Sequence, residues 1–321
     1  MSSKLILAVS IFASFQAAAI ENGTPVDWKK DFDDFVSGNC TGLVVGGNQI
    51  LTAGHCGIVK NKIEGHDGAN IAVNSRVDHP KYNYYSNYDF SVLDVANIKT
   101  QNIHFFADLS QPTAVKGDTV TAFGFGGSPK TLKKGDFKIE RVSSVSIDML
   151  YHRYEIGSVK TVNGDSGGAW FNSSNKIIGI TRGGEAVSDL FYAKDFILDK
   201  VNGWHYPTVL KGIGTKTVKV QSLHKNSVVD AAYVAGDVTI TGGTCQSKAT
   251  IDAFDICTYI LDVKGSGKLH LTSSETVDIN PASPKPVPPK AAPATSGGSG
   301  GSLGIIGLFG LALVGRFRCK K

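Results

Sequence analysis

The stretch GLVVGGNQILTAGHC, residues 42–56, decides how the first part of this chain folds. It belongs to a series of short apolar runs that are separated by glycine-containing turns, a pattern that predicts short β-strands. At its end a histidine, His55, stands directly before Cys56. Such a histidine can be a metal ligand, a packed core residue or a base that serves a nucleophile elsewhere in the sequence.

Similar short runs recur along the chain from Ile20 to about residue 207. They include DFSVLDV at 89–95, DTVTAFGFGG at 118–127 and KIIGITRGG at 176–184. Regularly spaced short strands with glycine turns predict an all-β barrel or sandwich. The segment YAKDFILDKVNGW, at 192–204, differs because its apolar residues recur at helical spacing, and it predicts the one helix of this region.

Length and composition set the broad class of the protein. The 321 residues leave room for two domains, and 41% hydrophobic with 19% charged residues is typical of a globular chain. The net charge of +5 is carried by the two ends, by Lys4 and by four basic residues among the last six. Removing these five from the 33 basic residues leaves 28, equal to the 28 acidic residues. The body of the protein is therefore neutral, which argues against a nucleic-acid partner.

The N-terminal segment MSSKLILAVSIFASFQAAA, residues 1–19, has one lysine, an apolar stretch and a small-residue end. This is the layout of a secretory signal peptide with an A-x-A cleavage site, and it implies a signal peptidase as a processing partner. A buried helix is the alternative, although the stretch has no polar face. Cleavage after Ala19 leaves Ile20 as the new N-terminus.

Export places the cysteines in an oxidising compartment. Of the five cysteines, Cys40 can pair with Cys56 and Cys245 with Cys257, while the sequence alone also permits other pairings. A zinc site is disfavoured because no second Cys or His stands at ligand spacing beside either pair. We therefore expect two disulfides and no bound metal.

Residues 208–280 form a second β-like region. Its runs KTVKVQSL, DVTITGG, ICTYILDV and KLHLTSS alternate apolar and polar residues, and we expect a Gly-Ser-Gly turn, at 265–267, to join the last two. The pattern predicts a small β-sandwich-like domain, stapled by Cys245 and Cys257. No residue pattern in it indicates chemistry, so we interpret it as a spacer or interaction module.

The C-terminal segment reads as a linker followed by a tail. Residues 281–302 are rich in Pro, Gly and Ser and predict an extended linker. In the tail, 303–321, the apolar core from Leu303 to Val314 is about a dozen residues, whereas a membrane-crossing helix needs about 20. A sorting signal with transient membrane contact is favoured over a weak transmembrane anchor.

The motif NGDSGG, residues 163–168, supplies the nucleophile that His55 would need. Its glycines let the backbone turn tightly, so that the amides of Gly164 and Ser166 can point at one oxyanion. The Ser166 hydroxyl requires a base, and a histidine base requires a carboxylate on its other ring nitrogen. Asp89, which precedes an apolar strand, is the predicted carboxylate, and Asp94 is its main rival.

In this order, TAGHC, YDFSVL and GDSGG resemble the trypsin/chymotrypsin family of serine endopeptidases, over residues 20–207. The resemblance implies a double six-stranded β-barrel of the chymotrypsin type with a C-terminal helix, followed here by the small β-rich domain. It implies peptide-bond hydrolysis through an acyl-enzyme on protein or peptide substrates, without a cofactor. The implied roles are base for His55, orienting carboxylate for Asp89, nucleophile for Ser166, and oxyanion donors for the amides of Gly164 and Ser166. Cys40 and Cys56 match the family's disulfide beside the catalytic histidine.

The start IENG, residues 20–23, resembles the family's IVGG or IVNG. The resemblance implies that the freed amino group of Ile20 pairs with Asp165, which shapes the oxyanion loop. Most eukaryotic members need a second cut to free this isoleucine. Here signal-peptide removal frees it directly, so we expect maturation on export without a propeptide.

The sequence departs from trypsins around the substrate pocket. The family's pocket positions fall on Lys160, Thr181, Arg182, Gly183 and Leu190. Lys160 stands where trypsins have an aspartate, so it would repel a basic P1 side chain; the alternative is that its side chain points to solvent. Thr181 falls where a serine normally binds the triad aspartate, Arg182 replaces a flat aromatic residue, and Leu190 replaces a glycine. The expected P1 preference is therefore a small apolar or an acidic side chain.

The tail resembles the GlyGly C-terminal sorting tails of secreted proteins from Gram-negative bacteria. In that family a rhomboid-type membrane protease cuts near the glycines, here Gly297-Gly298 or Gly300-Gly301. The resemblance implies passage through the periplasm to the cell surface or medium. A surface adhesion or binding protein that has lost catalysis is the alternative function. The other histidines, His66, His79, His104, His152, His205, His224 and His270, are expected at the surface or in loops.

Overall fold

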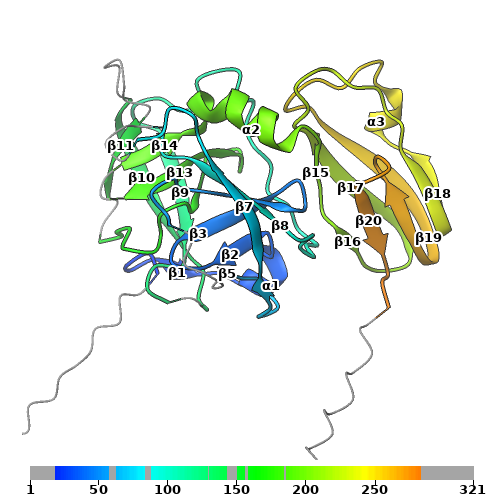
Figure 1. Ribbon diagram of the computed structural model, residues 1–321, viewed down its shortest axis with the longest axis horizontal. Helices are drawn as coiled ribbons and strands as arrows, with labels where there is room; N and C mark the ends of the chain where they lie inside the picture. Colours follow the sequence, from blue (N-terminus) through cyan, green and yellow to red (C-terminus); the bar gives the residue numbers. More distant parts are fainter. Residues whose placement is uncertain are drawn as a thin grey trace, which may run out of the picture. The chain divides into compact units, whose positions relative to one another are not determined.

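The computed structural model in Figure 1 describes residues 19–57, 63–83, 88–128, 130–142, 150–155, 158–183 and 186–282. Almost all of the predicted signal peptide and linker, and the whole predicted sorting tail, lie outside the described residues. No helix within the described ranges is long and apolar enough to cross a membrane.

The first barrel-like sheet contains residues 42–52, the start of the stretch that ends at His55 and Cys56. Seven antiparallel strands follow the order β6-β5-β2-β3-β4-β8-β7. Their bounds are β2 Phe35–Ser37, β3 Thr41–Val45, β4 Gln49–Thr52, β5 Ile63–Glu64, β6 Asn70–Ile71, β7 Val73–Asp78 and β8 Ser91–Val95. Strands β3 and β4 confirm the short strands predicted here; they form a hairpin, and both are buried throughout because each contributes to the apolar core.

The second sheet closes into a barrel. Its order is β1-β10-β11-β14-β13-β12-β9, and β10 also pairs with β9, so six of its seven strands form a ring. Their bounds are β1 Thr24–Pro25, β9 Thr119–Gly124, β10 Lys133–Val142, β11 Leu150–Glu155, β12 Ala169–Phe171, β13 Ile177–Gly183 and β14 Ala186–Asp189. The two sheets confirm the predicted all-β, chymotrypsin-like architecture.

The helices of the described ranges are few and short. They are α1 Trp28–Asp31, the 3₁₀ helix η1 Leu190–Ala193, α2 Lys194–Val201 and α3 Thr244–Ser247. Helix α2 confirms the helix predicted near the end of the protease region, and it ends at Asn202, whose left-handed conformation (φ 40°) is a common helix stop.

The predicted C-terminal domain contains a separate six-stranded sheet, within the compact unit that spans Met1–Ala282. Its path is β15-β17-β19-β20-β16, with β18 on the other side of β19. The bounds are β15 Trp204–His205, β16 Val209–Leu210, β17 Gly214–Ser222, β18 Tyr233–Gly242, β19 Ile256–His270 and β20 Thr276–Ile279. The sheet thus begins at Trp204, slightly before the expected boundary at 207/208.

The expected Gly-Ser-Gly turn at 265–267 is wrong. Strand β19 continues through these residues, and its partner on one side changes from β17 to β20. On the other side its pairing with β18 shifts register between Gly236 and Val238. The glycines serve close packing, since a Cβ on Gly267 would lie 2.4 Å from the carbonyl oxygen of Ala235. Local sequence cannot separate a glycine turn from a glycine at which a long strand changes its partner.

Both predicted disulfides are present. Cys40 is bonded to Cys56, and Cys245 is bonded to Cys257. The first pair connects the start of β3 to the loop that carries His55, and the second lies within the buried core of the C-terminal domain.

Candidate active site

The loop between residues 158 and 168 holds Ser166 in a tightly turned backbone. Gly164 (φ 99°) and Gly167 (φ 80°) both adopt conformations that favour glycine. A Cβ on Gly164 would lie 2.2 Å from the carbonyl oxygen of Gly126. Among the described residues, the N–H groups of Gly164 and Ser166 donate to no protein acceptor, whereas that of Gly167 donates to the carbonyl of Thr181 (2.7 Å). Two amides beside the serine hydroxyl are therefore available for a ligand oxygen.

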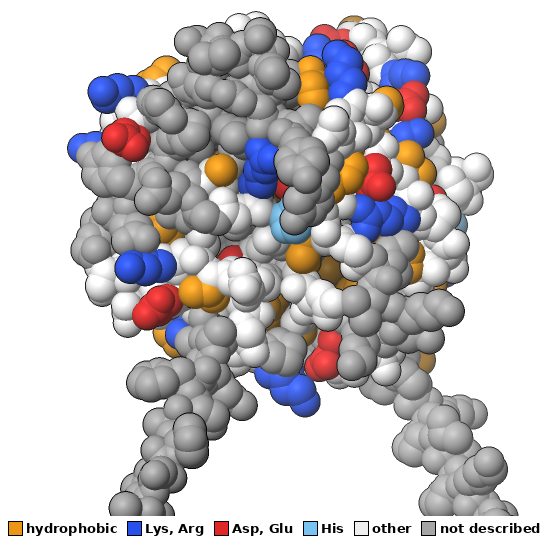
Figure 2. All heavy atoms as spheres, turned by 60° about the vertical axis from the view of Figure 1, so that its left-hand side comes forward, with side chains coloured by type: hydrophobic (Ala, Val, Ile, Leu, Met, Phe, Trp, Pro, Cys, Tyr) orange, Lys and Arg blue, Asp and Glu red, His pale blue; other side chains and the backbone are white. Residues whose placement is uncertain are grey.

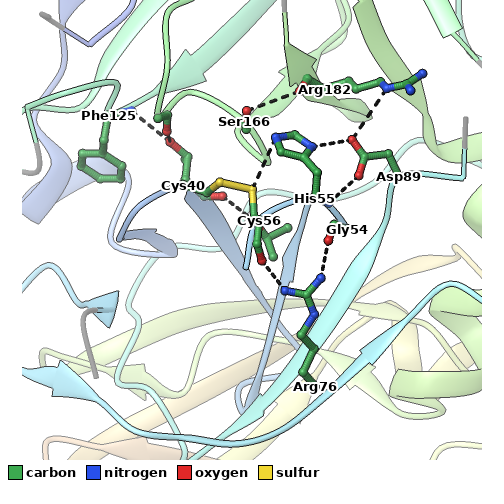
Figure 3. Close-up of a disulfide and its surroundings, with 12 residues drawn as sticks. Cys40, Gly54, His55, Cys56, Arg76, Asp89, Phe125, Ser166 and Arg182 are labelled. Atoms are coloured by element: carbon green, nitrogen blue, oxygen red, sulfur yellow. Dashed lines mark hydrogen bonds and ion pairs between the residues drawn. A yellow bond between two sulfur atoms is a disulfide. The ribbon is translucent and has the colours of Figure 1, made fainter. Parts of the chain in front are cut away.

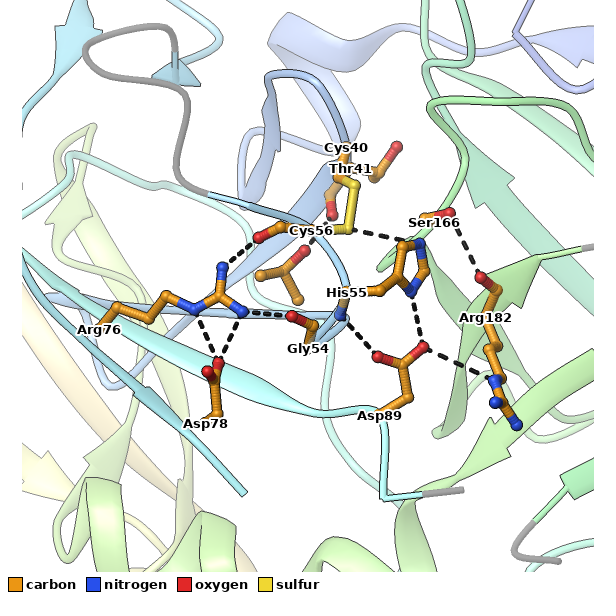
Figure 4. A network of polar contacts seen from close by, with 11 residues as sticks. Cys40, Thr41, Gly54, His55, Cys56, Arg76, Asp78, Asp89, Ser166 and Arg182 are labelled. Carbon is orange, nitrogen blue, oxygen red and sulfur yellow. Dashed lines mark hydrogen bonds and ion pairs between the residues drawn. A yellow bond between two sulfur atoms is a disulfide. The ribbon is translucent and has the colours of Figure 1, made fainter. Parts of the chain in front are cut away.

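His55 and Asp89 meet because of the pairing between β4 and β8. Thr52 lies opposite Ser91, so the residues that follow β4 and precede β8 lie at the same end of the sheet. The carboxylate of Asp89 accepts the backbone N–H of His55 on Oδ1 (2.7 Å), and its Oδ2 lies 2.7 Å from His55 Nδ1. Asp89 is buried, whereas the His55 side chain is 30% exposed. Figure 4 shows this arrangement, in which the carboxylate contacts the Nδ1 side of the imidazole.

Ser166 lies beside the imidazole on the side away from Asp89, as Figures 3 and 4 show. Its hydroxyl donates to the backbone carbonyl of Arg182 (3.4 Å) instead of to His55. The Nε2 atom of His55 faces the sulfur of Cys56 at 4.0 Å. Long or misdirected catalytic hydrogen bonds are common without substrate, and a rotation about χ1 of Ser166 would redirect the hydroxyl.

The rival carboxylate, Asp94, lies further along β8 and binds other partners. It accepts hydrogen bonds from Ser75 and from Gln49. Because side chains alternate along a strand, and because Asp94 is five residues after Asp89, it lies well away from His55. The structure brings Asp89, not Asp94, to the histidine.

Ile20 and Asp165 also meet. The backbone nitrogen of Ile20 lies 3.4 Å from Asp165 Oδ1, and both residues are fully buried. The second carboxylate oxygen of Asp165 accepts the N–H of Val162 (2.7 Å). Ile20 has a φ of 22°, which is a strained value for a β-branched residue.

The five expected pocket residues do not form one group. Lys160 has an exposed side chain, and its backbone pairs with Glu21. Gly183 (φ 138°) ends β13, next to residues 184–185, which lie outside the described residues. Leu190 begins η1 and is fully buried in the main hydrophobic core, so its expected place in the pocket is wrong. Counting residues along the chain misplaces it, because loop lengths vary among proteins that share a fold.

Thr181 and Arg182 have different partners, at a point where the pairing of β13 with β14 is irregular. The Thr181 hydroxyl accepts the indole N–H of Trp170 (2.8 Å). The Nε of Arg182 instead lies 3.9 Å from Asp89 Oδ2 (Figure 3). The structure therefore puts Arg182, and not Thr181, where a serine was expected to meet the aspartate.

A second arginine, absent from the residues predicted for the site, braces the loop of His55. Arg76, on β7, donates to the carbonyl oxygens of Gly54 and Cys56 and forms an ion pair with Asp78 at 2.7 Å (Figure 4). No local sequence signal identifies it, because its contact depends on how β7 pairs with β8.

A cluster of possible metal ligands lies at the same place. Cys40, His55 and Cys56 have potential ligand atoms within 4.8 Å of one another. The two sulfurs are joined in a disulfide and are not thiolates, so they do not suit a metal ion.

The expectation that the remaining histidines lie at the surface or in loops is wrong for His205, which lies in β15, whereas His79 and His104 lie in loops that tertiary packing encloses. His205 is fully buried, and burial lowers its pKa to about 4. His79 is 8% exposed, and burial together with the charge of Lys81 lowers its pKa. His104 is paired with Asp34 at 3.0 Å. Their sequence contexts are polar or mixed, and only tertiary packing encloses them.

Comparisons with known proteins identify a family for this chain. The family model described as Trypsin matches residues 24–196. No curated protein matches the chain. Among solved structures, "Structure of Vibrio cholerae VesB protease" is similar at 16% sequence identity and a TM-score of 0.46, covering 81% of this chain and 98% of that chain. Because the family match spans more than half of the residues, the chain belongs to the trypsin family of serine proteases.

Proposed function

We propose that this chain is a serine endopeptidase that cleaves peptide bonds through an acyl-enzyme on Ser166. One observation carries the proposal: the Ser166 hydroxyl and the His55–Asp89 pair come together in the described chain. Beside them, the N–H groups of Gly164 and Ser166 donate to no acceptor among the described residues. Acyl transfer requires these groups together, and a binding protein does not.

In the proposed mechanism Ser166 first turns from the Arg182 carbonyl toward Nε2 of His55. As the hydroxyl oxygen attacks the substrate carbonyl, its proton moves to His55, and the imidazolium is stabilised by Asp89. The N–H groups of Gly164 and Ser166 bind the developing oxyanion. His55 then returns the proton to the leaving amine. A water molecule attacks the acyl-enzyme in the same way, with His55 as the base, and the carboxylic acid product is released from Ser166.

The proposed P1 preference is a small apolar or an acidic side chain. No acid stands at position 160, and the nearby carboxylates of Asp89 and Asp165 are buried and bound within the protein. A basic P1 side chain would therefore meet no counter-charge from these residues.

Maturation is proposed to occur by cleavage after Ala19. While the chain is intact, Ile20 is held at a strained φ and its nitrogen contacts Asp165 as an amide. Cleavage removes the preceding carbonyl and thereby the strain, and it creates an ammonium group next to a buried carboxylate. A buried charge is stable only with such a partner. A mature N-terminus other than Ile20 would contradict this step.

We further propose export, with signal peptidase and a membrane sorting protease as processing partners. The support is the sequence of residues 1–19 and 281–321 alone. On the face of the molecule in Figure 2, basic and acidic side chains are interspersed, in keeping with a protein substrate rather than a polyanion.

The decisive experiment is labelling of the purified mature protein with a biotinylated fluorophosphonate. We expect one label per chain, on Ser166, and none in the variant Ser166→Ala. A correctly folded, processed wild-type protein that takes no label would support the non-catalytic binding protein instead.

Substrate preference is tested separately with chromogenic peptides that differ only at P1. We expect Ala or Glu to be cleaved faster than Arg. Rapid cleavage of the Arg peptide would overturn the specificity proposal and leave the serine protease mechanism intact.

A further inference from the structure

We infer that Arg182 is a positioning residue of the active site, which holds Asp89 from β13 and shares with His55 the carboxylate that orients the imidazole. The inference rests on the proposed function. The guanidinium Nε lies 3.9 Å from Asp89 Oδ2, the same oxygen that lies 2.7 Å from His55 Nδ1. The carboxylate is thus shared between a histidine and a permanent cation.

The position of Arg182 is fixed by its backbone as well as by its charge. Its carbonyl accepts the hydroxyl of Ser166 (3.4 Å), so one residue contacts both the nucleophile and the carboxylate (Figure 3). The preceding residue is locked by two backbone bonds, because Thr181 donates to Gly168 (2.8 Å) and accepts from Gly167 (2.7 Å). Arg182 lies where the pairing of β13 with β14 shifts register, between Thr181 and Gly183, and its side chain reaches Asp89 from there.

Burial makes this contact relevant. Asp89 is 2% exposed and the Arg182 side chain 22% exposed, so solvent screens the pair less than it screens a surface ion pair. The charge of Arg182 therefore acts on the carboxylate even at a separation of 3.9 Å.

Other charged or titratable groups face Asp89 less directly. Arg76, on β7, reaches the loop through the carbonyls of Gly54 and Cys56, and Asp78 neutralises it. The ring of Tyr82 approaches Gly54 from the loop that follows β7. Of the described cations, Arg182 is therefore the one that contacts the carboxylate itself.

The chemical consequence follows from Coulomb's law. A cation beside the carboxylate weakens the stabilisation of a protonated imidazole, because it repels the imidazolium and shares its counter-charge. Neutralising Arg182 should move the acid limb of the activity profile to higher pH.

The test measures the rate of fluorophosphonate labelling of Ser166 between pH 4 and 9, which requires no knowledge of the natural substrate. In Arg182→Gln we expect the half-maximal pH of labelling to rise by about one unit, which slows labelling about tenfold on the acid limb. Arg182→Lys, which retains the charge, should restore most of the wild-type profile. Lys216→Gln, which removes one positive charge from β17, should leave the profile unchanged.

Two outcomes overturn the inference. One is an Arg182→Gln profile that superimposes on that of the wild type, and the other is an Arg182→Lys profile that shifts as far as that of Arg182→Gln. Thermal unfolding of each variant shows whether it is folded. If Arg182→Gln is unfolded, the pH profile of labelling is measured with Arg182→Met instead. Absence of labelling in the wild type would overturn the proposed function itself, a result distinct from an unshifted profile.

Discussion

Two histidine–aspartate pairs of this protein have the same local construction and different surroundings. His55 donates its backbone N–H to Asp89 at 2.7 Å and places Nδ1 at 2.7 Å from the same carboxylate. His104 donates its backbone N–H to Asp34 at 2.8 Å and places Nδ1 at 3.0 Å. In both pairs the carboxylate fixes the main chain and the ring together.

The difference lies in what the second ring nitrogen can reach. His55 is 30% exposed and lies beside the hydroxyl of Ser166. His104 is 13% exposed and stacked on Phe32, with ring centroids 4.9 Å apart and planes 8° apart. Its carbonyl is 2.9 Å from Nε2 of His205, which packs in the start of the C-terminal domain. The two histidine–aspartate pairs thus share the same local geometry. The residues around each pair decide whether its histidine can take part in catalysis or only stabilises the fold.

The largest expected effect separates the two pairs by activity. Asp89→Asn should preserve the shape of the site but hold His55 in the wrong tautomer, so we expect kcat/KM to fall by roughly 10⁴. Labelling with fluorophosphonate should slow in parallel. Asp34→Asn serves as the matched control and should label at a rate within a few-fold of the wild type at 25 °C. Comparable activity losses in both variants would show that the pairs are not functionally distinct.

The second prediction reverses the comparison and measures stability. Burial by itself lowers the pKa of His104, but the charge and hydrogen bond of Asp34 outweigh burial, so the pKa is raised. Asp34→Asn leaves this buried histidine without its counter-ion and should lower the free energy of unfolding by about 4 kcal/mol. Urea denaturation at pH 6 measures the loss. An unchanged midpoint would mean that the pair contributes nothing to the fold.

The pH dependence of stability sharpens the second prediction. Because the pKa of His104 is raised in the folded state, its pairing with Asp34 stabilises the fold fully below about pH 6.5, the pKa of histidine in the unfolded chain. This stabilisation is lost as the pH rises through the pKa of His104 in the folded state. The stability gap between wild type and Asp34→Asn should therefore narrow at alkaline pH. A gap that is constant from pH 6 to 9 would contradict the assignment to His104.

The third prediction concerns His205, whose behaviour has the opposite sign. Burial lowers its pKa to about 4, so the folded state resists protonation that the unfolded chain accepts. Stability should fall by about 3 kcal/mol as the pH drops from about 6.5 to about 4. His205→Gln should flatten this part of the curve of unfolding free energy against pH. An identical slope in the variant would assign the acid sensitivity to other groups.

The smallest expected effect compares the two disulfides. Each closes a short loop, with sequence separations of 16 and 12, so the double variants Cys40→Ala/Cys56→Ala and Cys245→Ala/Cys257→Ala should each lose about 2–3 kcal/mol. Only the first should also slow labelling, because it releases the loop of His55. Equal labelling rates in both variants would show that this loop needs no covalent support.

Much of the fold was accessible from the sequence because its signals are local. Short apolar runs with glycine turns predicted β-strands in a barrel or sandwich, the resemblance to the trypsin family implied two barrels, and helical spacing predicted α2. The disulfide partners are near neighbours in the chain, so the pairing needed little three-dimensional information. His55 follows the end of a strand, and Ser166 lies in a tight glycine turn. These local features predicted His55 and Ser166 as partners.

The sequence by itself determined the strands, the helix and the chemical identity of the groups around residues 55, 89 and 166. Only the tertiary structure decided that Arg182 rather than Thr181 faces Asp89, that Leu190 belongs to the core, and that β19 continues through 265–267. The reason is that side chains alternate along a strand. A shift of one residue in register exchanges the two faces of the strand, and register is fixed by partners that lie far away in the chain.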